Sequence, residues 1–204
     1  MTTSNDAVED THLPITIEQE EQLYSGFRQV HTYTYRENQS GFSARREIVS
    51  AHHAVAVVAY DPTLDKLVMI RQFRIGAQLG TGKGLSVELA AGLIDPGEDP
   101  QTAAERELLE ETGLQSRNVK PMCQFLTTPG LTDEVLHIFY AEVDAQYLTE
   151  EAGHAGESEQ TFPFTLTLEQ ALAAVDSNAI YNGIVMTGLM WFARNRDQLV
   201  NRPT

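Results

Sequence analysis

The sequence predicts an α+β fold in which a mixed β-sheet lies between helices, as in an α/β/α sandwich. Three observations predict this class. Strand-forming runs dominate residues 26–144, one helical stretch interrupts them at 99–113, and two further helical stretches follow near 168–175 and 182–195. Strands with helices inserted and appended are typical of a sheet that packs between helices. At 204 residues the chain has room for one domain with, at most, a small attached lobe.

The N-terminal part divides into two segments. Residues 1–22 are polar and acidic, and we expect a flexible lead-in. Residues 26–36 (GFRQVHTYTYR) alternate as a strand does. Because residues 23–50 are too few for a core of their own, we expect a small antiparallel β lobe attached to a main domain at 51–204.

The main domain begins with strands. Five are expected, at residues 51–62, 66–73, 84–95, 119–130 and 134–144. The turn residues from Asp61 to Asp65 predict a hairpin between the first two. Pro96 and Gly97 end the third.

The helix at 99–113 carries both a start and a stop signal. Asp99 is a favourable N-cap residue, and Pro100 suits the first helical position. Gly113 suits the position that follows a helix.

Three glutamates share one face of this helix. Glu107, Glu110 and Glu111 fall within about 100° of arc, where like charges destabilise a helix. Only Arg106 offers a local positive charge. A divalent cation would compensate the cluster, and the alternative is a solvated acidic helix face.

Composition restricts the classes of function. The formal net charge of −15 argues against nucleic acid as a partner, because phosphate binding needs a basic surface. Basic clusters at residues 44–47 and 71–74 are where an anionic substrate would bind. We expect no membrane association, since no apolar run approaches about 18 residues. The single Cys123 and an N-terminus without signal-peptide features favour the cytoplasm.

Residues 92–114 (GLIDPGEDPQTAAERELLEETGL) form the most specific pattern. Gly92 is followed after five residues by Glu98, and after seven more by the run from Arg106 to Leu114. All nine specified positions match the Nudix box, so the chain resembles the Nudix hydrolase superfamily. One departure is Ala90, where many relatives have proline.

Other segments resemble bacterial ADP-ribose pyrophosphatases within that superfamily. Pro129 lies sixteen residues after Gly113, a position that marks this group, although Pro-Gly alone is a simple turn. The similar segments, in matching order, are RREI (45–48), QFRIGA (72–77) and GESEQ (156–160).

The resemblance implies roles for individual residues. Arg106 and Glu98 would orient the glutamate cluster, and Glu157 would be the general base, with His154 as a competitor. The implied metal ligands are Glu107, Glu110, Glu111, Glu159 and the backbone carbonyl of Ala91. The resemblance also implies catalytic roles for Glu111 and Arg106.

The resemblance also suggests where substrate binds. Glu88 either faces the substrate or is a paired carboxylate within the sheet. In the basic cluster at residues 71–74, alternation places Arg71 on the opposite face of the strand from Arg74. A metal role for His52 and His53 is disfavoured, because adjacent strand residues point to opposite faces. The substrate-binding candidates are Arg46, Glu47, Arg74, Glu88, Pro129 and Glu134.

The implied activity is hydrolysis of the pyrophosphate bond of ADP-ribose to AMP and ribose 5-phosphate, with Mg²⁺ as cofactor and Mn²⁺ as a possible replacement. Hydrolysis of another nucleotide sugar, such as GDP-mannose, and a non-catalytic ADP-ribose sensor are the alternatives. The implied partners are a small-molecule nucleoside diphosphate derivative and a second copy of the chain, with the N-terminal sheets packed or exchanged in a homodimer.

Overall fold

A computed structural model describes residues 8–153 and 160–200. Two compact units are distinguished among these residues, one formed by residues 8–51 with 128–133 and the other by the remainder.

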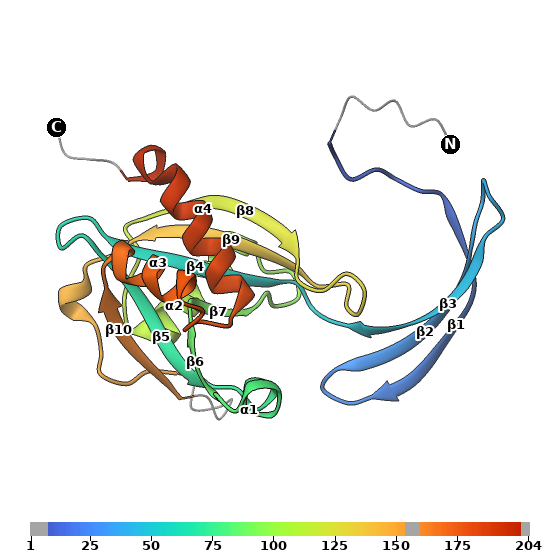
Figure 1. Ribbon diagram of the computed structural model, residues 1–204, viewed down its shortest axis with the longest axis horizontal. Coiled ribbons are helices and arrows are strands. Elements are labelled where there is room, and N and C mark those ends of the chain that lie inside the picture. The colour runs from blue at the N-terminus through green and yellow to red at the C-terminus, as the bar shows by residue number, and fades with distance from the viewer. Residues whose placement is uncertain (1–7, 154–159, 201–204) are drawn as a thin grey trace. The chain divides into compact units, whose positions relative to one another are not determined.

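The first unit is a three-stranded antiparallel sheet in the order β1-β2-β3. Its strands are β1 (Ile15–Ser25), β2 (Gln29–Glu37) and β3 (Ser43–Ser50) (Figure 1). Residues 128–133 join it, because the Val49 amide donates to the Leu131 carbonyl at 2.8 Å and the Ala51 amide donates to the Asp133 carboxylate at 2.7 Å.

The expectation of a flexible lead-in through residue 22 is wrong from Ile15 onward. Two register shifts, between Ile17 and Gln19 and between Gln22 and Tyr24, interrupt the alternation that would have marked β1 in the sequence. All eleven residues of β1 are exposed, so an edge strand can carry its acidic side chains without burying them.

The second unit contains a seven-stranded mixed sheet in the order β10-β5-β4-β9-β8, with β6 paired to β5 and β7 paired to β4. Its strands are β4 (Ala54–Asp61), β5 (Lys66–Phe73), β6 (Leu85–Glu88), β7 (Ala90–Leu93), β8 (Asn118–Leu126), β9 (Val135–Glu142) and β10 (Thr161–Leu166). The pairing of β4 with β9 is parallel, and the other pairings are antiparallel.

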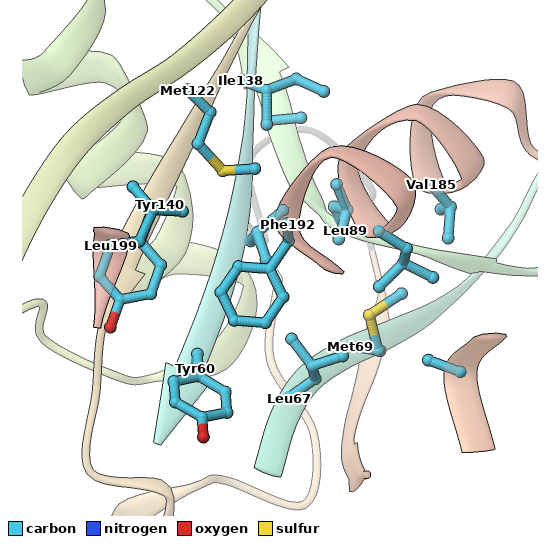
Figure 2. Close-up of a cluster of buried hydrophobic side chains, with 14 of the residues drawn as sticks. Tyr60, Leu67, Met69, Leu89, Met122, Ile138, Tyr140, Val185, Phe192 and Leu199 are labelled. Carbon is cyan, nitrogen blue, oxygen red and sulfur yellow. The ribbon is translucent and has the colours of Figure 1, made fainter. Parts of the chain in front are cut away.

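Helices cover both faces of this sheet, which confirms the predicted fold class. They are α1 (Ile75–Thr81), α2 (Pro100–Thr112), α3 (Leu168–Asp176) and α4 (Gly183–Leu199), with a short 3₁₀ helix η1 (Ala145–Tyr147). One face of β4 packs through Val55 and Val57 with Leu108 of α2. On the other face α4 lies across the sheet (Figure 1). Its Phe192 stacks on Tyr140 at a centroid distance of 6.0 Å and meets Tyr60 in a tilted contact at 5.3 Å (Figure 2).

The expected strand at 84–95 is two strands. The chain pairs with β5 as far as Glu88 and with β4 from Ala90, so the switch of partner falls at Leu89. β4 begins at Ala54, later than expected, which leaves His52 and His53 before the strand. Helix α1 and strand β10 were not expected from the sequence. Among the described residues, no helix is long and apolar enough to cross a membrane.

Candidate active site

Helix α2 begins and ends where its sequence predicts. The Asp99 carboxylate accepts hydrogen bonds from the amides of Gln101 and Thr102, each at 3.1 Å, and Pro100 follows as the first helical residue. Gly113 adopts a left-handed conformation with φ of 72°, and its amide donates to the Leu109 carbonyl. These local signals fix the ends of α2, and its buried residues, which include Ala104, Leu108 and Glu111, define the face turned to the sheet.

That face brings two of the three glutamates against strand β7. Glu111 is 2% exposed, and its carboxylate accepts a hydrogen bond from the Ala91 amide at 2.7 Å. Glu107 is 8% exposed and lies against Gly92, where any Cβ would overlap its carboxylate. A side chain at position 92 would therefore displace the Glu107 carboxylate from where it now lies.

Arg106 connects the loop, the strand and the helix. Its guanidinium donates to both oxygens of Glu98 at 3.0 and 2.9 Å, and to the Leu93 carbonyl at 3.0 Å. It also donates to Glu107 at 2.7 Å and to Glu110 at 3.3 Å. These hydrogen bonds are the physical basis on which Arg106 and Glu98 could orient the glutamate cluster.

The two partners shift each other's protonation. Hydrogen bonding to Arg106 is the main cause that lowers the pKa of the Glu98 carboxyl, and the Asp95 amide adds to it. Hydrogen bonding to Glu98 raises the pKa of the Arg106 guanidinium further above its ordinary value. Both groups are therefore charged across the neutral range.

The donor set suits a hard divalent cation. Glu107, Glu110 and Glu111 offer carboxylate oxygens and the Ala91 main chain lies beside them, and oxygen ligands are what Mg²⁺ prefers. Within the described ranges, no three acidic, histidine or cysteine side chains form a cluster already arranged for a metal. Arg106 draws Glu107 and Glu110 toward itself, while Glu111 is held by the strand, so ion binding would require these side chains to move.

A second charged pair lies on strands β5 and β6. The Arg74 guanidinium donates to both oxygens of Glu88 at 2.9 to 3.2 Å. The Glu88 side chain is 7% exposed, whereas that of Arg74 is 42% exposed. Of the two alternatives for Glu88, the structure has the paired carboxylate, and the pair leaves part of the guanidinium accessible to an anion. Arg71 lies on the opposite face, as alternation predicts, over the Phe164 ring.

Strand β10 contributes a contact that the sequence did not indicate. The Thr161 hydroxyl donates to the Glu111 carbonyl at 2.9 Å, and Thr161 forms an isolated antiparallel bridge with Ala152. The Gly153 amide donates to the Glu110 carbonyl at 3.0 Å. Gly153 and Thr161 therefore both contact the end of α2. Glu157, Glu159 and the competitor His154 lie outside the described residues.

The remaining candidates have other surroundings. Glu134 precedes β9 and accepts a hydrogen bond from the Thr127 hydroxyl at 2.7 Å. Arg46 and Glu47 are adjacent on β3 in the first unit, and so face opposite sides of that sheet. Pro129 belongs to the segment that joins the same unit.

Comparison with known proteins agrees with the motif. The NUDIX domain model matches residues 50–182. The chain is 34% identical over 185 residues to ADP-ribose pyrophosphatase of Escherichia coli strain K12, with 89% of this chain and 88% of that protein covered. It is 36% identical over 163 residues to ADP-ribose pyrophosphatase of Bacillus subtilis strain 168, with 79% and 83% covered.

A solved structure supports the same fold. The crystal structure of an ADP compounds hydrolase matches with a TM-score of 0.74 at 20% identity, covering 93% of this chain and 98% of that one. The family match includes the whole segment from Gly92 to Leu114, whose side chains build the arrangement of loop, strand and helix described above. The chain therefore belongs to the Nudix family.

Proposed function

We propose that this protein hydrolyses the pyrophosphate bond of ADP-ribose to AMP and ribose 5-phosphate in the presence of Mg²⁺, with Mn²⁺ as a possible substitute. The main support is that relatives named ADP-ribose pyrophosphatase share 34 to 36% identity with this chain over most of its length. The retained set of Glu107, Glu110 and Glu111 favours an enzyme over a non-catalytic sensor.

The glutamates of α2 would hold the cation, together with the Ala91 carbonyl and Glu159. A divalent cation there would neutralise phosphate charge and assist attack by water, which are the two needs of pyrophosphate hydrolysis. Arg106 would orient Glu107 and Glu110, because it binds both side chains, and these would have to turn from it toward the ion. Glu157 is proposed as the general base.

Arg74 would bind an oxygen of the diphosphate. Its guanidinium is held by the buried Glu88, and the side chain as a whole is 42% exposed, so binding an anion requires little further ordering. Glu88 would then act through Arg74. Arg46, Glu47, Pro129 and Glu134 are proposed as further substrate-binding residues.

The first unit is proposed as a dimerisation lobe, extending the expected 23–50 to include β1. Ile15 and Ile17 are 46% and 48% exposed on an edge strand, and Phe27 is 84% exposed. Apolar side chains on a small sheet without a core favour association, and a homodimer is the simplest arrangement.

A substrate panel tests the activity. Formation of the nucleotide product would be measured by chromatography with ADP-ribose, GDP-mannose and a dinucleoside polyphosphate, in Mg²⁺ and in excess chelator. We expect the highest kcat/KM for ADP-ribose and no turnover in chelator. A tenfold preference for GDP-mannose would assign the protein to another nucleotide sugar, and tight ADP-ribose binding without turnover would make it a sensor.

A further inference from the structure

Strand β5 carries a buried side-chain amide, that of Gln72. The residue is 4% exposed, and its Oε1 atom has no hydrogen-bond partner within residues 8–153 and 160–200. Buried polar atoms nearly always have a partner, and an exception is commonly completed by a water, an ion or a ligand. A polar side chain with an unused acceptor therefore points to a group that binds there.

The register places Gln72 within the active-site face of the sheet. Alternation puts it on the same face as Arg74, whose backbone is still extended with φ of −123° and ψ of 111°. On its two sides Gln72 pairs with Thr161 of β10 and Ser86 of β6. Thr161 in turn donates to the Glu111 carbonyl. Gln72 thus lies between the end of the catalytic helix and the arginine proposed to bind the diphosphate.

The unused atom restricts the chemistry of its ligand. An amide oxygen only accepts hydrogen bonds, and the diphosphate oxygens at neutral pH also only accept. The diphosphate itself therefore cannot form a hydrogen bond with Gln72 Oε1. The Arg74 guanidinium is directed to Glu88. In a nucleoside diphosphate sugar, the groups that can donate near the diphosphate are the sugar hydroxyls.

We propose that Gln72 Oε1 accepts a hydrogen bond from a sugar hydroxyl of the substrate, which makes Gln72 a specificity-determining residue. The proposal rests on the proposed function and adds to it a reason for preferring a hydroxyl-rich substrate. A site built to bind a hydroxyl discriminates against analogues that lack it, because its own polar atom is then left unpaired. Either the distal ribose or the adenosine ribose is a possible source of that hydroxyl.

Three compounds distinguish these sources. ADP-ribose has both sets of hydroxyls, the β-methyl ester of ADP lacks the distal sugar, and 2′,3′-dideoxyadenosine diphosphoribose lacks the adenosine hydroxyls. They would be compared on wild type and on Gln72→Leu, which removes the amide at similar volume. Gln124→Leu is the matched control, since Gln124 is an exposed glutamine on β8 of the same sheet.

We expect Gln72→Leu to lower kcat/KM for ADP-ribose by about five- to tenfold, and to change the value for one of the two deficient compounds by less than about twofold. The compound that is spared identifies the hydroxyl. Equal losses on all three compounds, or no loss on any, would overturn the proposal. Gln124→Leu should leave all three values unchanged.

Two further measurements separate this proposal from its alternatives. The thermal midpoint of Gln72→Leu should equal or exceed that of wild type, and a fall of more than about 3 °C would show a partner within the chain and refute the proposal. Titration calorimetry in chelator measures the three affinities without turnover. A wild type that binds ADP-ribose but never hydrolyses it refutes the proposed function. In that case the role of Gln72 is decided by the affinities: it stands only if Gln72→Leu, and not Gln124→Leu, loses the tighter binding of ADP-ribose over the compounds that lack hydroxyls.

Discussion

Arg74 and Glu88 are paired by three hydrogen bonds of 2.9 to 3.2 Å, although 14 positions separate them in the chain. The antiparallel pairing of β5 with β6 brings them together, since it sets Ile70 opposite Glu88 and Phe73 opposite Leu85. The buried carboxylate can fix the guanidinium, and the Arg74 side chain as a whole remains 42% exposed.

Replacing Glu88 by glutamine should weaken substrate binding more than it slows the chemical step. The variant keeps the shape of the side chain and removes the charge that holds Arg74 in place, so we expect KM to rise about tenfold with kcat within about twofold of wild type. Steady-state kinetics with ADP-ribose measure both values. A fall in kcat at constant KM would show instead that Glu88 acts on the reacting groups.

Replacing Glu111 by glutamine should lower turnover by on the order of 10²-fold, since it removes a charge from the proposed cation site and keeps the side-chain shape. The matched control is Glu105→Gln, an exposed glutamate on the same helix, which should retain wild-type activity. Circular dichroism would verify that both variants fold. Near wild-type turnover for Glu111→Gln, or full activity in excess chelator, would reject the metal-ligand assignment.

Acid should weaken the contribution of Glu98 to stability. Arg106 lowers the folded-state pKa of Glu98, so the charged carboxylate stabilises the fold above its unfolded-state pKa of about 4.3. That contribution is lost as the pH falls through the lower folded-state value. The difference in thermal midpoint between wild type and Glu98→Gln should therefore be constant from pH 8 to about pH 6 and narrow below about pH 5. A difference that widened in acid would contradict the lowered pKa.

The dimerisation lobe can be tested at an exposed apolar position. Ile17→Lys places a charge on the edge strand β1, and we expect it to convert a dimer into a monomer, as measured by sedimentation velocity. Gln124→Lys makes the same change of charge on β8 and should leave the mass unchanged. A monomeric wild type would reject the proposed lobe function.

Local chemistry explains what the sequence predicted well. The caps of α2 are set by Asp99, Pro100 and Gly113 within the helix itself, so its boundaries and its acidic face could be inferred without knowledge of the rest of the chain. The hairpin before Lys66 is similar, because the Asp61 carboxylate accepts from the amides of Thr63 and Leu64 inside the turn.

Distant pairing explains what the sequence did not predict. The division of the expected strand at Leu89 arises because β6 pairs with β5 and β7 pairs with β4. Both partner strands come from an earlier part of the chain, so the sequence around Leu89 does not indicate the change of partner. Helix α1 buries none of its residues, so it has no apolar face by which its sequence could be identified. Likewise, Thr161 and Glu111 are 50 residues apart in the chain, and no motif in the sequence of β10 predicts their contact.

Strand β7 and helix α2 are joined at three successive positions: the Ala91 amide binds Glu111, Gly92 lies against Glu107, and the Leu93 carbonyl binds Arg106. A fluctuation that detached the helix would have to break all three together. In native-state hydrogen exchange, the amides of this strand and helix should therefore become accessible as one cooperative unit. Because the glutamates have to move to bind an ion, ion binding should change exchange at backbone amides of β7, including those of residues whose side chains never touch the ion.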